Sequence, residues 1–224
     1  MWADAGLVAG KDLRIELRSR VGVNQVLPFS LVVLVLFAFA LDPDRGILER
    51  AAAGLFWVAV LLSALLAVQR SAGLEAADGV PDAQRLAGLD PAGIFLGKAA
   101  ALAVQLAVLE VLLGAGVVVL YGVRLQGVAT LVATAAAATV GLAAAGTVYG
   151  ALAAGLRVRE TLLPLLVLPV VAPVLIAATR ASEAALTGVA LEVDPASWLR
   201  LLAVFAVVYL AFGVAAYGAL LEET

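Results

Sequence analysis

Six long apolar runs divide this chain, and they restrict its possible folds more than any other feature. The apolar runs are 26–41, 51–68, 99–123, 125–156, 161–179 and 201–221, and charged residues gather between them. A helix needs about 20 apolar residues to cross the hydrocarbon core of a bilayer, and most of these runs approach or exceed that length. In lipid every backbone polar group needs an internal partner, which favours helices. The sequence therefore predicts an all-α integral membrane protein with six transmembrane helices in one domain, 1–224.

Composition supports this class and excludes several others. Hydrophobic residues make up 64% of the chain, against roughly 45–50% in a soluble domain. The chain has no Cys and no His, and its single Met is Met1. A disulfide framework, a thiolate–imidazole metal site and a His-dependent catalytic triad are therefore impossible. We expect no enzyme activity, no bound cofactor or metal, and no nucleic-acid partner for this chain itself.

The positions of Lys and Arg predict how the chain crosses the membrane, because these residues are enriched in cytoplasmic loops. With both termini in the cytoplasm, the inner segments hold Lys11, Arg14, Arg18, Arg20, Arg70, Arg85, Lys98, Arg157 and Arg159. The outer loops then hold Arg45, Arg50, Arg124, Arg180 and Arg200. The larger inner set favours a multi-pass inner-membrane protein with both termini in the cytoplasm.

The charged start of the chain, 1–22, precedes the first membrane segment. Its stretch "KDLRIELRSR" places apolar residues among Arg14, Glu16 and Arg18. Such a pattern is typical of an amphipathic helix that lies at the membrane surface with its basic residues near the lipid headgroups. The alternative is a basic flank with no further role. We interpret the run that follows as a membrane segment rather than as a secretory signal, because the charged leader is long for that role.

The longest polar stretch, 69–97, falls between the second and third membrane segments. Pro81 and Asp82 before "AQRLAG" predict one short cytoplasmic helix. This helix could press against a partner protein, or the stretch could be a solvated linker. At its end, "GIFLGKA" lacks the spacing and the Ser or Thr of a phosphate-binding loop. We interpret it as the start of a helix, with Lys98 extending to the headgroups.

Glu110 interrupts the third apolar segment near its middle. A carboxyl at this depth is costly and by default indicates a functional site. We expect a polar contact with a neighbouring helix, with Gln105 or Thr134 among the candidate partners, or a place along a transport pathway. Proton coupling is the alternative.

The fourth segment, 125–156, would span roughly 48 Å as one helix against a core of about 30 Å, so it must tilt, protrude or break. It is rich in small residues and contains "GTVYG" at 146–150. Because small residues let helix backbones approach closely in lipid, we expect this segment to pack tightly.

The fifth segment, 161–179, contains Pro164, Pro169 and Pro173. Each proline removes a backbone donor and clashes with the carbonyl four residues earlier, at a cost of about 3 kcal/mol inside a helix. Such breaks are tolerated in a membrane where neighbouring helices or local adjustments satisfy the freed carbonyls. The prolines predict a kinked helix or two half-helices, and they are candidate hinge residues.

The order of these parts resembles the CcmB family, the membrane subunits of the cytochrome c maturation ABC complex. The resemblance runs from about Asp12 to the end of the sixth segment. The portions that carry it are "RSRVGVNQVLPFSLVVLVLFAFAL", "AAGLFWVAVLLSALLAVQRS", "GIFLGKA" and "LLPLLVLPVVAPVLIAA". One departure is Ala72, which stands where an aromatic residue is expected after "RS".

The resemblance implies a six-helix ABC-2-type permease with an N-terminal amphipathic interfacial helix. It implies a homodimer that pairs with CcmA-type ATPase subunits, which bind the ATP. It also implies CcmC- and CcmD-type membrane subunits and, indirectly, a CcmE-type haem chaperone. The polar stretch would then be the ATPase-coupling element, with the candidate coupling residues Glu75, Asp78, Asp82 and Arg85.

The function we expect is to couple ATP hydrolysis in the partner to haem export, or to release of the haem-loaded chaperone, in cytochrome c biogenesis. Without His or Cys, haem passage through this chain would lack the usual axial ligands, so we favour energy coupling. The alternatives are a generic ABC-2 exporter of lipids or drugs, a proton-coupled carrier using Glu110, and a purely structural assembly subunit.

Overall fold

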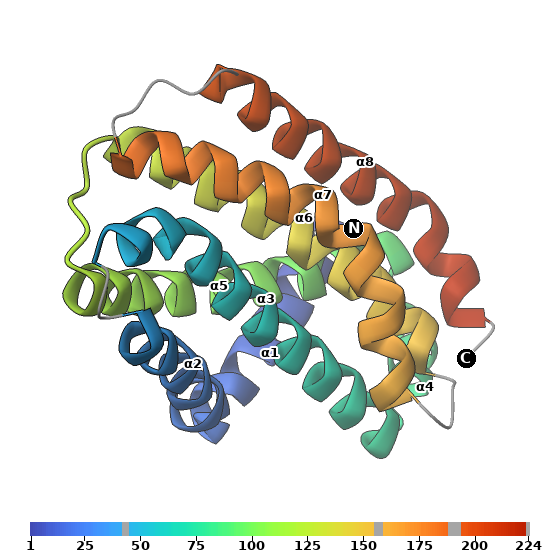
Figure 1. Ribbon diagram of the computed structural model, residues 1–224. Coiled ribbons are helices and arrows are strands. Elements are labelled where there is room, and N and C mark those ends of the chain that lie inside the picture. Colours follow the sequence, from blue (N-terminus) through green and yellow to red (C-terminus); the bar gives the residue numbers. More distant parts are fainter. Residues whose placement is uncertain (42–44, 155–158, 188–193, 223–224) are drawn as a thin grey trace.

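A computed structural model describes residues 1–41, 45–154, 159–187 and 194–222 of the chain. Arg157, which contributes to the orientation argument, lies outside the described residues. The helices are α1 (Trp2–Ser19), η1 (Gly22–Val26, a π-helical turn), α2 (Leu27–Leu41), α3 (Arg45–Asp78), α4 (Val80–Leu86), α5 (Pro91–Tyr121), α6 (Val128–Ala154), α7 (Arg159–Thr187) and α8 (Pro195–Glu222). Figure 1 shows these helices as one bundle, and no strand occurs in the parts described.

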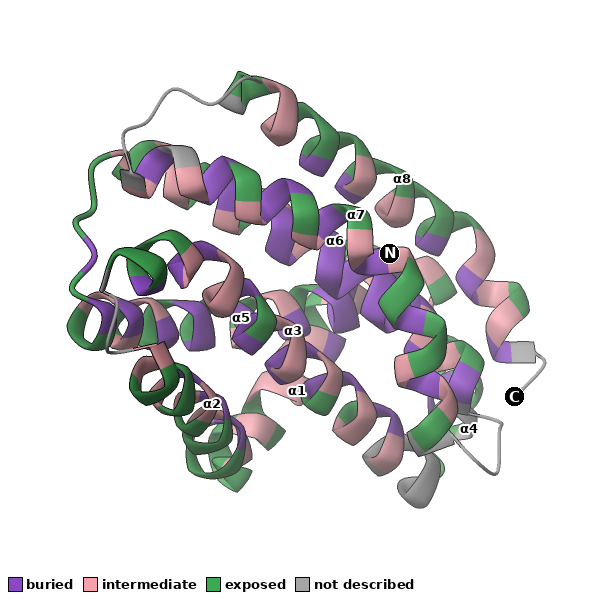
Figure 2. Ribbon diagram, viewed as in Figure 1, coloured by how far each residue is buried: buried purple, intermediate pink, exposed green. Residues whose placement is uncertain are grey.

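Six of the helices are long and apolar enough to cross a membrane. Their spans are Asn24–Leu41, Gly46–Gly73, Pro91–Tyr121, Val128–Ala153, Thr161–Glu183 and Ala196–Leu221. Large apolar side chains cover the outward faces of α2 and α8, where Figure 2 shows mostly exposed residues. In water such faces would be unfavourable, whereas in lipid they cost nothing. The expected fold class, an all-α membrane protein with six transmembrane helices, is confirmed.

The polar stretch 69–97, in which one short helix was expected, is mainly helical, and α4 (Val80–Leu86) is that short helix. α3 continues through it to Asp78, and α4 follows after Gly79, whose φ of 61° suits glycine. α5 begins already at Pro91, because the Asp90 side chain accepts a hydrogen bond from the backbone N–H of Ala92 at 3.0 Å and caps the helix. The second and third membrane helices therefore extend well beyond the apolar segments 51–68 and 99–123.

The fourth membrane helix is shorter than its apolar run. α5 ends at Gly122, which has a φ of 67°, and α6 begins only at Val128. The first part of the uncharged run thus belongs to the connection between the two helices. The glycine in left-handed conformation is a common helix end, and it turns the chain back so that α5 and α6 form an antiparallel hairpin.

α6 lies at the centre of the bundle, in contact with α3, α5, α7 and α8. Its residues 141–148 are all buried. A Cβ at Gly146 would lie 2.8 Å from Cγ2 of Val68 on α3, so only glycine permits this approach. The small residues of the segment therefore explain why this helix, rather than another, occupies the interior.

α5 and α8 interlock in a similar way. The Phe95 ring is fully buried and occupies the space that a Cβ at Gly213 would need. The same ring lies 5.6 Å from the ring of Tyr217, also on α8. This cluster fixes α8 against the first half of α5.

The proline-rich segment is one continuous helix. α7 passes through Pro164, Pro169 and Pro173 and extends to Thr187, beyond the expected end at residue 179. Two half-helices separated by a break, one of the expected forms, are not observed. Pro169 and Pro173 lie on an exposed face of α7, whereas Val167, Val171 and Val174 pack inward. The inward face therefore holds the helix together while the prolines face away from the core.

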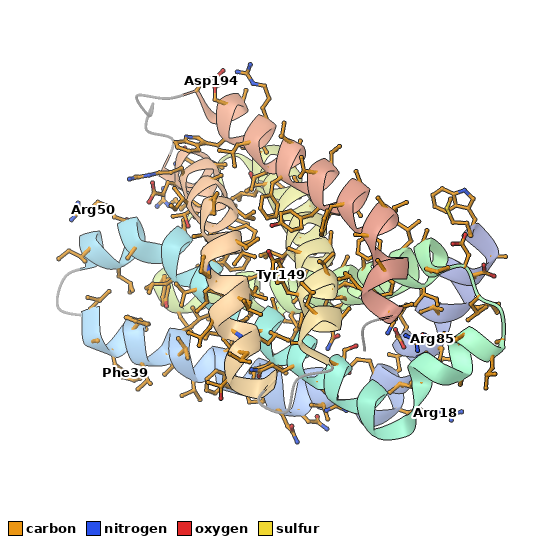
Figure 3. All side chains as sticks on the ribbon, turned by 90° about the vertical axis from the view of Figure 1, so that its right-hand side faces the viewer. Arg18, Phe39, Arg50, Arg85, Tyr149 and Asp194 are labelled. Carbon is orange, nitrogen blue, oxygen red and sulfur yellow. The ribbon has the colours of Figure 1, made fainter. Side chains whose placement is uncertain are left out.

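The two ends of the bundle carry different parts of the chain. Figure 3 places Arg18 and Arg85 at one end and Arg50 and Asp194 at the other. The first end therefore holds the junction of α1 and α2 and the α4 region. We call this end the α4 end of the bundle.

Candidate functional site

α1 packs directly on the first part of α5. A Cβ at Gly97 would lie 2.6 Å from the backbone oxygen of Ala5, and one at Gly93 would lie 2.7 Å from that of Met1. The glycines of "GIFLG" therefore form a flat surface on which the α1 backbone rests. The stretch that superficially resembles a phosphate-binding loop is a helix-packing motif.

Polar contacts fix the first turn of α1 beside the start of α5. Asp4 accepts hydrogen bonds from the amino group of Met1 at 3.1 Å and from the backbone N–H of Asp90 at 3.3 Å. The amino group and then this N–H lower the pKa of the Asp4 carboxyl below its usual range. The carboxylate thus joins the N-cap of α5 to α1.

Glu16 holds the other end of α1. Its Oε1 accepts a hydrogen bond from the backbone N–H of Gly22 at 2.6 Å, and its Oε2 lies 4.0 Å from Nε of Arg70 on α3. Arg20, with a φ of 52°, ends α1 through a bond from its N–H to the Glu16 backbone oxygen. One residue therefore ties the end of α1 to the π-helical turn before α2 and to α3.

The other two residues predicted for the interfacial helix are exposed. Arg14 and Arg18 both project from α1 away from the bundle. Trp2 and Leu17 on the same helix are 75% and 74% exposed. A helix that presents large apolar and cationic side chains side by side suits the boundary between lipid tails and headgroups.

A cavity of about 120 Å³, whose lining is mainly apolar, lies among α1, α3, α5 and α6, behind the Glu16 contacts. Its charged lining residues are Lys11, Asp12, Glu16, Arg70 and Lys98. The prediction for Lys98 was wrong, because this side chain is only 8% exposed and faces the cavity instead of extending to the surface. Gln105 also lines this cavity and is therefore not the partner of Glu110.

The segment predicted to contact the ATPase, which includes α4, lies at the α4 end of the bundle. Within α4, Gln84 is buried, whereas Arg85 is exposed and Leu86 is 91% exposed. Figure 3 shows Arg85 at this end of the bundle. The side chains of the other predicted coupling residues, Glu75, Asp78 and Asp82, lie outside the described residues. The prominent feature that sequence reasoning missed is Leu86, a large apolar side chain on a polar segment.

The Glu110 carboxyl pairs with a different residue from those expected. Oγ1 of Thr139 on α6 donates a hydrogen bond to its Oε1 at 2.6 Å, and both residues are buried. The register of the hairpin explains the pairing, since Glu110 lies as far before the end of α5 as Thr139 lies beyond the start of α6. Thr134 is also buried, but its hydroxyl has no partner among the described residues.

An apolar groove of about 650 Å³ opens beside this pair. α3, α5, α6 and α7 line it mainly with Ala and Val, and Phe56 and Trp57 contribute aromatic rings. Trp57 Nε1 donates to Ser182 Oγ at 3.0 Å, which joins α3 to α7 at the wall of the groove. Among the described residues that line this groove, Glu110 alone is charged.

Together these features define a class of protein. Six apolar helices and an amphipathic helix at one end form the membrane body, from which a short helix projects at that same end. Among the described residues, no group of His, Cys, Asp or Glu could hold a metal ion. The chain is a multi-pass α-helical membrane protein.

Comparison with known proteins gives the family. The family model described as "CcmB protein" matches residues 5–223. The chain belongs to the CcmB family, as its resemblance predicted. The match includes most of α1, all six membrane helices and the α4 segment.

Several curated relatives are named "Heme exporter protein B". The protein of Paracoccus denitrificans is 35% identical over 222 residues, which is 95% of each chain. That of Rhodobacter capsulatus is 32% identical over 183 residues, 82% of this chain and 84% of the relative. That of Haemophilus influenzae is 34% identical over 175 residues, 78% and 79% of the two chains.

Proposed function

We propose that this chain is the membrane subunit of a haem-exporting ABC complex in the bacterial inner membrane. The observation that carries the proposal is the family match across residues 5–223, together with relatives named for haem export. Adenine-nucleotide chemistry would belong to a CcmA-type ATPase partner. CcmC- and CcmD-type subunits and a CcmE-type chaperone would receive or present the haem.

The orientation that we propose places both termini and the α4 end in the cytoplasm, where an ATPase would bind. The Lys and Arg distribution supports it, as does the presence of Arg18 and Arg85 at the same end. Arg50 and Asp194 would then face the periplasm.

Leu86 is the feature of this end that best fits a partner contact. A side chain that is 91% exposed on a cytoplasmic segment leaves apolar surface in water, and a groove in the partner would cover it. Arg85 beside it, and Glu75, Asp78 and Asp82 nearby in sequence, would supply polar contacts around the apolar centre.

A continuous path leads from this contact into the membrane. α4 follows α3, which is one helix from the α4 end to the opposite end of the bundle. Arg70 on α3 lies beside Glu16, which is bonded to the turn that begins the first membrane helix. Movement of α4 would therefore be transmitted to α1, α2 and α3 together. The outer faces of these helices would transmit it to the other subunit of the homodimer.

Energy coupling fits this chain better than direct haem carriage. Haem is usually held by His, Cys or Met side chains, and here His and Cys are absent and the only Met is Met1. ATP-driven movement would then reshape the complex so that another subunit gives up the haem-loaded chaperone. The prolines of α7 would provide the bending point within the membrane.

The contacts of Glu110 support a structural or pathway-lining role for this residue. Its Oε1 is engaged by Thr139 within the same helical hairpin, and it faces an apolar groove. A proton carrier needs a relay of titratable groups across the membrane, and the described part of the groove lining contains no second one.

Extraction in mild detergent tests the proposal. We expect an affinity-tagged chain to retain an ATPase and a haem-handling membrane subunit, and the ATPase rate to depend on the chain. Recovery of the ATPase without any haem-handling subunit would favour a generic ABC-2 exporter. Recovery of neither would contradict the proposal.

A further inference from the structure

The apolar groove has polar groups at its floor and apolar residues at its rim. Glu110, Thr139 and Ser182 line it and are all less than a tenth exposed. Val111 on α5 and Val132 on α6 also line it and are 72% and 62% exposed, so the groove opens to the outside of the bundle. Its volume of about 650 Å³ suits a small organic ligand, since such sites measure roughly 300–1,000 Å³. A molecule dissolved in the bilayer can therefore enter it from the side.

The carboxyl at this floor lies deep in the membrane. Glu110 precedes Tyr121, where the membrane span of α5 ends, by 11 residues. This is roughly 16 Å along the helix axis, about half the thickness of the hydrocarbon core. Among the described residues the carboxyl has one hydrogen-bond partner, Thr139, which donates to Oε1 and leaves Oε2 without a donor. A charge at this depth is costly unless it is paired, and it indicates a ligand or ion pathway.

An aromatic ring lies beside this carboxyl. A Cβ at Gly114 would lie 3.9 Å from Cε2 of Phe56, so the Phe56 ring packs against α5 at that position. Gly114 follows Glu110 by four residues, and positions four apart share one face of a helix. The ring and the carboxyl are therefore about one helical turn apart on the same side of α5. Trp57, whose ring lies edge-on to that of Phe56 at 5.2 Å, extends the aromatic lining of the groove.

We propose that this groove binds a lipophilic organic cation. The Glu110 carboxylate supplies the opposite charge, and the faces of aromatic rings such as Phe56 and Trp57 attract cations. The Ala and Val residues of the lining accommodate the apolar body of the ligand. An anion is disfavoured, because the described lining includes no cationic side chain. The inference does not rest on the proposed role in haem export.

Two ions of nearly the same size and shape but opposite charge, tetraphenylphosphonium and tetraphenylborate, test the proposal. Purified protein in neutral detergent is dialysed to equilibrium against either ion, with protein-free micelles as the blank. We expect saturable binding of tetraphenylphosphonium at one site per chain, and no uptake of tetraphenylborate beyond that of the blank. Equal binding of the two ions would overturn the proposal. So would the absence of tetraphenylphosphonium binding, which is the result expected if a second copy of this chain or lipid acyl chains fill the groove.

Variants assign the binding to the groove. Glu110→Gln should weaken tetraphenylphosphonium binding by at least about tenfold, because the charge is lost while an oxygen that can accept from Thr139 remains. Phe56→Leu keeps an apolar side chain without the ring face and should weaken it by about threefold. Glu49→Gln removes an exposed carboxylate of α3 outside the groove and should bind with full affinity.

Thermal unfolding of each variant shows whether it is folded. If Glu110→Gln does not fold, the comparison of Phe56→Leu with Glu49→Gln decides. Full affinity in a folded Glu110→Gln protein, or a loss in Glu49→Gln equal to that in Phe56→Leu, would contradict the proposed site.

Discussion

At the scale of single residues, glycines determine where helices touch. Gly97 supports α1, Gly146 receives Val68, and Gly213 makes room for Phe95. In lipid, helices gain little from apolar burial and depend on close packing instead. The lack of a side chain at these three positions therefore allows the helices to pack closely.

Gly97→Ala should destabilise the protein by about 1–3 kcal/mol, because the new methyl group overlaps the backbone oxygen of Ala5 and forces α1 away. Thermal unfolding in one detergent measures the effect. Gly10→Ala on α1 is the control, since a Cβ there has nothing within 4 Å. It should be neutral or slightly stabilising. Equal melting temperatures for both variants would refute the packing role of Gly97.

Glu110 offers a second residue-scale prediction. Glu110→Gln keeps an oxygen that can accept the Thr139 hydroxyl, so haem delivery should remain close to that of the wild type. Thr139→Val leaves the buried carboxyl without this donor and should lower stability by about 1–3 kcal/mol. Haem loading of the chaperone and thermal unfolding are the two measurements. Loss of haem delivery in Glu110→Gln, with stability unchanged, would instead support proton coupling.

At the scale of elements, α7 and α4 are the two helices for which we propose mechanical roles. α7 keeps Pro169 and Pro173 on an exposed face, where their missing backbone donors weaken the helix without disturbing the core. α4 is short, and its Gln84 is buried while its Leu86 is exposed. The first is suited to bending and the second to contact with a partner.

Replacing both Pro169 and Pro173 with Ala should stabilise α7, because each proline costs about 3 kcal/mol inside a helix. If α7 bends during the cycle, the double variant should hydrolyse ATP but deliver less haem. Pro28→Ala, in the first turn of α2, is the control and should leave delivery unchanged. A double variant with full delivery would remove the hinge proposal.

Leu86→Asp should reduce recovery of the ATPase in detergent extracts, because a charge replaces the apolar side chain at the proposed contact. The fold should be unaffected, since Leu86 is 91% exposed. Leu125→Asp provides the control, as Leu125 is also exposed but lies in the α5–α6 connection at the opposite end. ATPase recovery that fell equally in both variants, or in neither, would exclude Leu86 as a specific contact.

At the scale of the whole molecule, helix number and class were predictable because a bilayer demands long apolar helices. Contacts between distant segments were not, since no periodicity indicates that Phe95 meets Gly213 or that Glu16 reaches Arg70. The Glu110–Thr139 pair is intermediate, because hairpin register predicts it once the ends of α5 and α6 are known. The predicted position of the Lys98 side chain, extending to the headgroups, was wrong because its burial depends on α1 covering α5.

The central claim is that this chain transmits the work of a partner ATPase and does not itself carry haem. The most direct test reconstitutes this chain with its ATPase alone into vesicles, adds haem and ATP outside, and measures ATP hydrolysis and internal haem. The account predicts ATP hydrolysis that depends on the chain, with no haem accumulating inside. ATP-dependent haem accumulation by these two subunits alone would contradict it.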